Sequence, residues 1–429
     1  MHSPLLSVII PTHNRCDLLI RNLLAFSSQV EANPKFEVLV VADACEDGTE
    51  EKVLNFAKQA PYTIRLLRHS ARNAAKTRNL GAAYATGKVL LFLDDDVLAE
   101  PGLVRAHMEA QGQNRVVFGY SKPTVPEKPS WWQNNARLWW EDVYTAMRQP
   151  DHRFSYRDFF SGNVSMPAEL FQSMGGFDTS MTGRLEDYEL GMRLLKAGAR
   201  FCFVPEAVGY HHDQTDLALW LRRIRLEGVA DVQIGERHPE LRTKLFAEYA
   251  GRSDSWGKIR RMIRKVAFSY PCRGNRLEHL LLSLATFSER RRLRGFWLYV
   301  TAALREYNYW RGVATEIKGR KALTAWLQEA PVPPACTKDT PVVDLSALPE
   351  NRTLQETLER ASNLGLRLAV GGVEVLTLPS QPGLEPLREE HLWGALQELA
   401  SKQFVPALAF QLILLDGGEG VPCSSSFVK

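Results

Sequence analysis

Cysteine is scarce in this sequence, and the six cysteines lie far apart. No Cys-x-x-Cys pair occurs in the 429 residues. Zinc ribbons and dithiol redox sites require such close pairs, so the sequence excludes both classes. The length of the chain excludes a small disulfide-stapled fold. We therefore expect reduced thiols and a cytoplasmic protein.

Long apolar runs are also missing. A membrane-spanning helix requires roughly 18 uninterrupted apolar residues, and the runs His279–Phe287 and Phe296–Leu304 are much shorter. The first apolar run, Leu5–Ile10, leads directly into Pro11 and has no secretory cleavage site. We expect a chain that is neither exported nor integral to a membrane.

Charge of one sign is not in large excess, and the glycine-rich loop of dinucleotide-binding proteins is absent. The net charge of +4 is too small to indicate a nucleic-acid partner. No Gly-x-Gly-x-x-Gly follows the first apolar run, which disfavours a dehydrogenase. With 45% hydrophobic and 24% charged residues, the composition is that of a folded globular protein.

Short β-rich runs alternate with segments of helical period between residues 5 and 121. The predicted strands are Leu6–Pro11, Phe36–Asp43, Tyr62–Arg68, Lys88–Asp94 and Arg115–Tyr120. Strands that alternate with helices indicate a largely parallel sheet covered by helices. We therefore predict the α/β fold class, with a Rossmann-like mixed sheet and helices on both of its faces.

The remaining sequence predicts further units. A block at 161–212 should pack back on the sheet, which gives a first domain at 1–215. A basic helical extension is expected at 216–328, followed by a proline-rich linker. A small α/β unit of unknown function is expected at 336–429. Its predicted strands are 342–345, 366–370 and 373–378, and its predicted helices lie near 352–363 and 389–402.

Basic residues cluster in three places in the helical extension. The clusters are Arg222, Arg223 and Arg225; Lys258, Arg260, Arg261, Arg264 and Lys265; and Arg290, Arg291, Arg292 and Arg294. Such runs are either solvated helix faces or a surface for a membrane or an anionic acceptor. Nearby aromatic residues favour the second interpretation, namely Trp297, Tyr299, Tyr307, Tyr309 and Trp310. We hypothesise a peripheral contact with the inner face of the cell membrane through this region.

Three carboxylates, Asp94, Asp95 and Asp96, directly follow the apolar run Leu90–Leu93. Ligands of open α/β sheets bind outside the carboxyl ends of the strands. Adjacent carboxylates repel one another, and Mg²⁺ or Mn²⁺ relieves that repulsion while also binding phosphate oxygens. The alternative is an acidic turn that caps the next helix. We favour a site for a metal–diphosphate complex.

Two further patterns have both a chemical and a structural interpretation. Glu186 and Asp187 open a predicted helix, where acids are common for dipole reasons, but a reaction that activates a hydroxyl needs such a carboxylate base. His211 and His212 end an extended run, where one imidazole could complete a metal site. Adjacent histidines are more often simply structural.

Two more segments also have two interpretations. Residues 72–81 carry three cations and two amides, which suit either the phosphates of a nucleotide or a solvated helix. Four tryptophans lie between residues 131 and 140, where they form either core packing or a wall that stacks on a sugar or an acceptor.

Together these residues resemble the family 2 glycosyltransferases, which have the GT-A fold. The motifs that carry the resemblance, in the family's order, are Val8–Thr12 with Asn14, Glu37–Val41 followed by Asp43 and Asp47–Thr49, Arg78-Asn79-x-Gly81, Asp94–Asp96, Gly162-Asn163, Gly175–Asp178 and Glu186-Asp187. The resemblance covers about residues 5–215 and implies that this half of the chain is the catalytic domain.

The resemblance implies a role for each matching position. Asp187, with Glu186 beside it, is implied as the base that deprotonates the acceptor hydroxyl. The implied ligands of Mn²⁺ or Mg²⁺ are Asp94, Asp96 and His211, or His212 in place of His211. The implied nucleotide-sugar-binding residues are Pro11, Thr12, Asn14, Asp43, Arg78, Asp94 and Asp95. The residues expected near the acceptor are Trp131, Trp132, Gly162 and Asn163.

We therefore predict an inverting, metal-dependent enzyme that moves one sugar from a nucleotide-diphosphate donor to a saccharide or lipid-linked acceptor, in polysaccharide or glycolipid assembly. No Gln-x-x-Arg-Trp motif, which the family's processive synthases carry, follows Asp187. Ala42-Asp43 stands where the family often has two acids, so the sequence does not determine the identity of the donor nucleotide. The alternative is a non-catalytic carbohydrate-binding protein on the same fold. A sugar-nucleotide pyrophosphorylase is disfavoured because Val8–Arg15 contains no glycine.

Overall fold

The computed structural model describes most of the chain in two compact units. One comprises residues 1–148 and 154–331, and the other comprises residues 149–153 and 332–429. The described residues are 5–32, 35–182, 184–246, 257–269, 275–331, 340–344, 354, 358, 366–378, 381–389 and 391–392.

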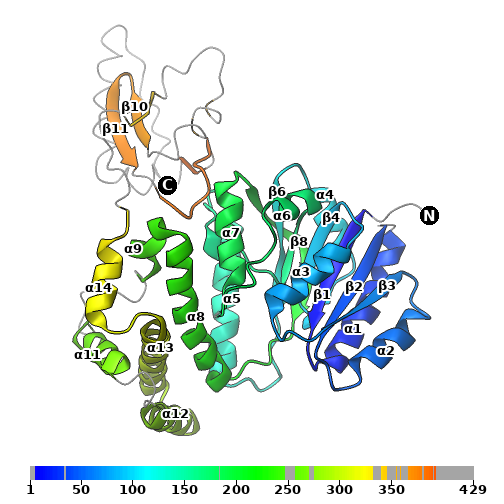
Figure 1. Cartoon of the computed structure of the whole chain (residues 1–429), viewed down its shortest axis with the longest axis horizontal. Helices are drawn as coiled ribbons and strands as arrows, with labels where there is room; N and C mark the ends of the chain where they lie inside the picture. Colours follow the sequence, from blue (N-terminus) through cyan, green and yellow to red (C-terminus); the bar gives the residue numbers. More distant parts are fainter. Residues whose placement is uncertain are drawn as a thin grey trace, which may run out of the picture. The chain divides into compact units, whose positions relative to one another are not determined.

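In the described part of the larger unit, eight strands form one mixed sheet (Figure 1). The strands are β1 (Leu6–Thr12), β2 (Phe36–Asp43), β3 (Thr63–His69), β4 (Val89–Leu93), β5 (Val97–Ala99), β6 (Arg115–Pro123), β7 (Asn163–Pro167) and β8 (Arg200–His211). Their order is β3-β2-β1-β4-β7-β6-β8-β5. Strand β1 pairs in parallel with β2 and β4, whereas β7 runs antiparallel to β4 and β6.

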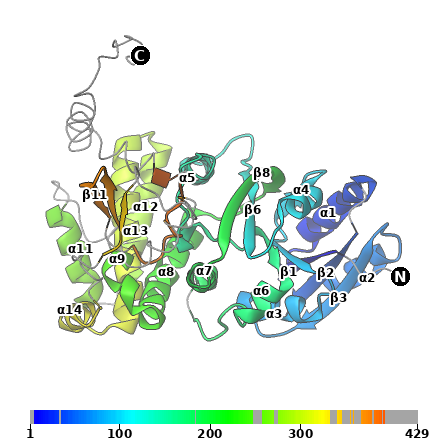
Figure 2. The same cartoon turned by 90° about the horizontal axis from the view of Figure 1, so that it is seen from above.

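Alternate side chains of β1 divide the core into two layers. Leu6, Val8 and Ile10 belong to one apolar cluster and Ile9 to the other, because successive strand residues point to opposite faces. Helices α1 (Cys16–Phe26), α2 (Thr49–Ala57) and α4 (Leu103–Ala110) contribute to the first cluster. Helices α3 (Ala74–Tyr84), α6 (Ala168–Ser173) and α7 (Glu186–Lys196) contribute to the second, and Figure 2 shows α3, α6 and α7 on one side of the sheet. The predicted fold class is confirmed.

Helices also pack beyond the sheet in the same unit. They are α5 (Trp131–Met147), α8 (Leu217–Arg237), α9 (Arg242–Leu245), α11 (Gly257–Ser269), α12 (Asn275–Arg290), α13 (Arg294–Glu316) and α14 (Arg320–Gln328). Helices α8 and α13 approach closely because glycine lies at their crossing. A β-carbon on Gly228 would lie 2.2 Å from the carbonyl oxygen of Tyr309, and one on Gly312 would lie 1.9 Å from that of Arg225.

The boundary predicted at residue 215, between the first domain and the helical extension, falls inside one compact unit. The reason is that α8 buries Ile224, Ala230 and Val232 in the same apolar cluster as the sheet residues Phe92 and Phe118. The helical extension is therefore packed on the predicted first domain. No helix among the described residues is both long enough and apolar enough to cross a membrane.

The aromatic residues of α13 correct one expectation. Trp297, Tyr307, Tyr309 and Trp310 are buried, and of the five aromatics that favoured a surface role only Tyr299 is exposed. The expectation is wrong for the other four because they pack inward, against neighbouring helices and within the apolar clusters of this unit.

In the smaller unit, the described strands form a sheet in the order β11-β10-β9. They are β9 (Val342–Asp344), β10 (Leu366–Val370) and β11 (Val373–Leu378), which confirms the three predicted strands. The backbone amides of Gly371 and Gly372, in the turn between β10 and β11, donate hydrogen bonds to the Asp344 carboxylate. The helices predicted near 352–363 and 389–402 lie almost entirely outside the described residues.

Candidate active site

The carboxyl ends of β1, β2 and β4 open into a cavity of about 1820 Å³. Thr12 ends β1, Asp43 ends β2, and Asp94–Asp96 directly follow β4. Glu186 and Asp187, the first two residues of α7, line the same cavity. Two acidic groups that lie far apart in the sequence therefore meet at the strand ends, where ligands of open α/β sheets bind.

Arg78 links the two acidic groups directly. One of its guanidinium nitrogens donates a hydrogen bond to Asp94 at 2.8 Å, and the other donates one to Glu186 at 3.1 Å. The Arg78 side chain is buried in the middle of α3. Gly81, one turn later, lets α3 lie against the sheet, because a β-carbon there would lie 2.4 Å from a methyl carbon of Ile9. The Arg78-Asn79-x-Gly81 motif thus positions a cation between the two acids.

The three strand-end carboxylates lie in different environments. Burial raises the pKa of Asp94, but the adjacent Arg78 guanidinium outweighs burial and leaves the pKa lowered. The pKa of Asp95 is raised to about 6, chiefly by burial and also by the charges of Asp96 and Asp94, while Arg15 opposes the shift. Asp95 accepts hydrogen bonds from the Thr12 hydroxyl at 2.8 Å and from Arg15 at 3.0 Å.

The surroundings of Asp96 fit a divalent metal ion. Its Oδ1 atom is buried and has no hydrogen-bond partner among the described residues, and it lies 3.8 Å from Nε2 of His211. Its Oδ2 atom accepts a hydrogen bond from Arg15 at 2.7 Å. Within the described part of the chain, no group of three or more histidine, cysteine or acidic side chains is arranged to hold a metal ion. A metal bound at Asp96 and His211 would therefore depend on other oxygen ligands, which diphosphate supplies.

Of the two adjacent histidines, His211 is the one whose imidazole lies beside Asp96 and lines the cavity. The backbone amide of His212 instead donates a hydrogen bond to the carbonyl oxygen of Asp96 at 2.8 Å. That bond continues the pairing of β5 with β8 and so places His211 next to the acids.

Asp187 has the properties of a base at neutral pH. Burial raises its pKa to about 7, and the neighbouring Glu186 adds to the shift, while Arg78 and Arg184 oppose it. The Tyr188 amide donates a hydrogen bond of 2.9 Å to Oδ1 of Asp187. A carboxylate with a pKa near the working pH is suited to general base catalysis.

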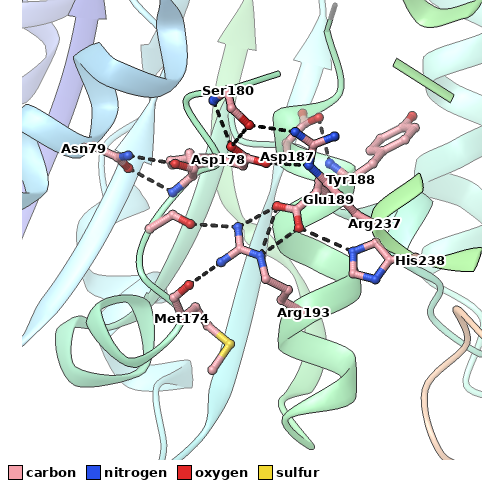
Figure 3. Close-up of polar contacts among 12 residues, drawn as sticks. Asn79, Met174, Asp178, Ser180, Asp187, Tyr188, Glu189, Arg193, Arg237 and His238 are labelled. Atoms are coloured by element: carbon pink, nitrogen blue, oxygen red, sulfur yellow. Dashed lines mark hydrogen bonds and ion pairs between the residues drawn. The ribbon is translucent and has the colours of Figure 1, made fainter. Parts of the chain in front are cut away.

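A polar network behind Asp187 holds α7 in place (Figure 3). The Asn79 side chain exchanges two hydrogen bonds with the backbone of Phe177, at 2.8 and 2.9 Å. Arg193 donates to the Glu189 carboxylate and to the carbonyl oxygens of Met174 and Gly176. The loop at 174–177 is therefore fastened both to α3, which carries Arg78, and to α7, which carries Asp187.

We expect Arg193→Ala to destabilise the fold. Glu189 is buried, and without Arg193 its one remaining ion-pair partner among the described residues would be His238, at 3.3 Å. Breaking a buried ion pair by removing one partner typically costs about 3–5 kcal/mol. Urea unfolding would measure the loss, with Arg105→Ala, an exposed arginine on α4, as the matched control. Equal stability of the two variants would contradict the structural role of this network.

The remaining residues predicted for the donor differ in their position. Pro11 and Asp43 line the cavity. Both oxygens of Asp43 accept hydrogen bonds from the chain itself, from the Arg72 and Asn73 amides and the Thr77 hydroxyl, and these outweigh burial to lower its pKa. The side chain of Asn14 accepts a hydrogen bond from the Glu46 amide, which indicates a role in shaping the loop.

The residues predicted to lie near the acceptor also differ in their surroundings. Trp132 lines the cavity, whereas Trp131 packs edge-on against Trp297 in an apolar cluster. Glycine is needed at position 162 for steric reasons, because a β-carbon there would lie 2.9 Å from Oδ2 of Asp94. Asn163 is buried, and its amide group bonds to His107 and to the carbonyl oxygen of Ala207. Its polar atoms are therefore used within the core.

Several cavity residues were not predicted from the sequence. Arg15 follows β1 and contacts two of the strand-end acids. Arg223, Glu227 and Asp231 line the cavity from α8. Their spacing of four residues was a usable signal, since it places the three charges on one helical face. Arg305 lines the cavity from α13.

Comparisons with known proteins agree with this geometry. Residues 7–175 match the model described as Glycosyl transferase family 2, and residues 141–214 match one described as N-terminal domain of galactosyltransferase. Validoxylamine A glucosyltransferase from Streptomyces hygroscopicus subsp. jinggangensis is 30% identical over 277 residues, which cover 57% of this chain and 64% of that protein. Residues 7–175 therefore form a glycosyltransferase family 2 domain.

Two further proteins show the range of the similarity. Chondroitin synthase from Escherichia coli is 26% identical over 240 residues, covering 48% of this chain and 34% of the synthase. The solved structure of the mannosyltransferase PcManGT from Pyrobaculum calidifontis, in complex with GDP-Man and Mn²⁺, is 20% identical with a TM-score of 0.48. It covers 72% of this chain and 86% of that one. The chain spans less than two thirds of the two validoxylamine relatives, at 64% and 59% of their lengths.

Proposed function

We propose that this protein transfers one sugar from a nucleotide-diphosphate donor to an acceptor hydroxyl, with inversion at the anomeric carbon. The observation that carries the proposal is the meeting of Asp94–Asp96 with Glu186 and Asp187 around one cavity, joined by Arg78. The match of residues 7–175 to the family 2 model and the similarity to glucosyltransferases support the same class of reaction. A saccharide or a lipid-linked saccharide, in polysaccharide or glycolipid assembly, is the proposed acceptor.

In the proposed reaction, the acceptor oxygen forms a bond to the anomeric carbon as the bond from that carbon to the diphosphate oxygen breaks. Asp187 takes the proton of the attacking hydroxyl, which is the role its raised pKa suits. Arg78 holds Asp94 and Glu186 in place through its two hydrogen bonds. A single displacement of this kind inverts the configuration of the sugar.

Asp96 and His211, with Asp94 nearby, would hold Mn²⁺ or Mg²⁺. The bound ion would stabilise the negative charge that develops on the leaving diphosphate. Arg15 bonds to Oδ2 of Asp96 and leaves Oδ1 available for the ion.

The side of the cavity formed by α8 and α5 is the proposed acceptor side. Glu227 lines this wall. Trp132 and Trp140 line the cavity from α5. A carboxylate beside aromatic rings suits a saccharide, whose hydroxyls donate hydrogen bonds while its ring carbons pack on the aromatic faces.

A panel of nucleotide sugars tests the proposed function. We expect release of nucleoside diphosphate from at least one donor with Mn²⁺ or Mg²⁺, and no release in the presence of a chelator. The anomeric configuration of the product, measured by NMR, should be inverted relative to the donor. Saturable donor binding without any turnover would instead support a non-catalytic carbohydrate-binding protein.

The rate of transfer should depend on pH through Asp187. Its pKa is raised to about 7, by burial first and then by Glu186, while Arg78 and Arg184 act in the opposite direction. The unprotonated carboxylate is the active form, so kcat should rise about tenfold per pH unit below pH 7 and level off above it. A kcat profile that is flat between about pH 5 and pH 8 would contradict Asp187 as the base.

A further inference from the structure

The corner between α12 and α13, residues 290–299, exposes basic and large apolar side chains side by side. Four exposed arginines lie within it, namely Arg290, Arg291, Arg292 and Arg294. Four large apolar side chains beside them are also exposed, namely Leu293 (46%), Phe296 (46%), Leu298 (45%) and Tyr299 (54%). The ten residues contain no acid. We call this segment the α12–α13 corner.

Buried residues of α13 anchor the α12–α13 corner to the rest of the unit. Trp297 and Val300 point inward and pack with Leu221 and Ala285 in one apolar cluster. The backbone amide of Leu293 donates a hydrogen bond to the carbonyl oxygen of Ser288 at 2.8 Å, which closes the turn after α12. Trp297 and Val300 therefore anchor this end of α13, while Leu293, Phe296 and Leu298 are exposed.

The exposed apolar surface continues onto α11. A groove of about 420 Å³ lies between the two helices, lined by Ile263 and Arg260 on one side and by Leu298, Tyr299 and the buried Glu306 on the other. Ile259 and Met262 of α11 are also exposed, at 43% and 61%. Lys258, Arg261 and Lys265 are exposed on the same helix. Large apolar side chains and cations therefore alternate over both helices.

We propose that the α12–α13 corner, together with the exposed face of α11, docks on the surface of an anionic lipid bilayer. Arginines attract anionic headgroups, and neighbouring Leu and Phe side chains enter the boundary between headgroups and acyl chains. Charge complementarity selects this partner, because the corner carries four cations and no acid. A second copy of the chain would bring like charges together at the same place.

The docking surface borders the proposed active site. Leu298 and Ala302 line both the groove and the large cavity. Docking would therefore bring the α13 wall of the cavity close to the bilayer, where a lipid-linked acceptor would be presented. Bilayer binding itself does not depend on the proposed transfer reaction and is measured without any donor or acceptor.

Cosedimentation of the full chain with vesicles tests the proposal. Vesicles of phosphatidylcholine with and without phosphatidylglycerol are the two probes. We expect binding only to the anionic vesicles, weakened by salt. The variant R290Q/R291Q/R292Q/R294Q should lower the partition coefficient about 10²- to 10³-fold, since each basic residue near the surface contributes about 1 kcal/mol, or about fivefold. The variant L293S/F296S should lower it at least about tenfold.

Matched controls distinguish docking through the corner from nonspecific electrostatic or hydrophobic binding elsewhere on the surface. K52Q/K58Q/R68Q/R105Q removes four exposed cations, on α2, directly after α2, on β3 and on α4. L54S/Y84S removes two apolar side chains of similar exposure, 45% and 52%. Both control variants should bind like the wild type. Equal binding to neutral vesicles, equal losses in the control and corner variants, or absence of vesicle binding would overturn the proposal. So would a concentration-dependent dimer, detected by light scattering, that the corner variants abolish.

Discussion

Asp187→Asn should lower kcat by about 10²- to 10⁴-fold, the usual loss when a general base is removed. The asparagine side chain occupies the same space but cannot take the proton of the acceptor hydroxyl. Donor binding should persist, because the strand-end acids and Arg78 remain in place. Single-turnover rates test the expected loss of kcat, and a separate measurement of donor affinity tests whether donor binding persists.

The same variant should be more stable than the wild type at pH 8. The pKa of Asp187 is raised in the folded protein, so folding favours its neutral form, and ionisation of this carboxylate lowers stability as the pH rises from about 4 to about 7. Asparagine carries no such charge. A higher melting temperature with a large loss of kcat would show that the loss is chemical rather than structural.

Glu169→Gln is the matched control for Asp187→Asn. Glu169 is an exposed acid in the first turn of α6, so it resembles Asp187 in its position on a helix but lies outside the cavity. Wild-type kinetics are expected for this variant. Near wild-type transfer by Asp187→Asn would rule out the assignment of the base.

Asp96→Asn should abolish the metal dependence of donor binding. The buried Oδ1 of Asp96, close to His211, is the atom that fits a metal ion best, and an amide is a poorer ligand than a carboxylate. Since the ion would supply several kcal/mol of charge stabilisation in the transition state, kcat/KM should fall about 10³-fold or more.

Thermal shift with donor and Mn²⁺ gives a second readout for Asp96→Asn. A ligand that binds only the folded state raises the melting temperature, and this rise should disappear in the variant. Asp17→Asn, at a strongly exposed carboxylate on α1 that forms an ion pair with Lys52, should keep the full shift. An unchanged metal-dependent shift in Asp96→Asn would remove Asp96 from the proposed metal site.

Much of the sheet could be predicted from the sequence because its strands are unusually apolar. Residues Leu6–Ile10 and Leu90–Leu93 leave few alternatives to buried strands, and the position of Asp94–Asp96 after such a strand is local information. The short strands β5 and β7 carry weaker patterns, and both are defined by antiparallel pairing with distant segments. Pairing of this kind depends on residues that no local window contains.

The charged face of α8 shows the same limit within the candidate site. Arg223, Glu227 and Asp231 share one helical face, which their spacing alone indicates, but the sequence does not say what that face meets. Close packing at Gly228 and Gly312 turns the face toward the cavity. The burial of the α13 aromatic residues was equally hard to predict. The helix packing that buries Tyr309 and Trp310 cannot be derived from the composition of α13.

The sequence by itself therefore determined the alternation of strands and helices, the strand-end position of the three aspartates and the order of motifs that marks the family. These are properties of short segments, in which apolar period and turn residues act locally. Only the tertiary structure decided that Arg78 joins Asp94 to Glu186, that Arg15 contacts Asp95 and Asp96, and that the arginines after α12 stand exposed beside apolar side chains. Each of these depends on contacts between segments distant in the chain, which the packing of the whole unit sets.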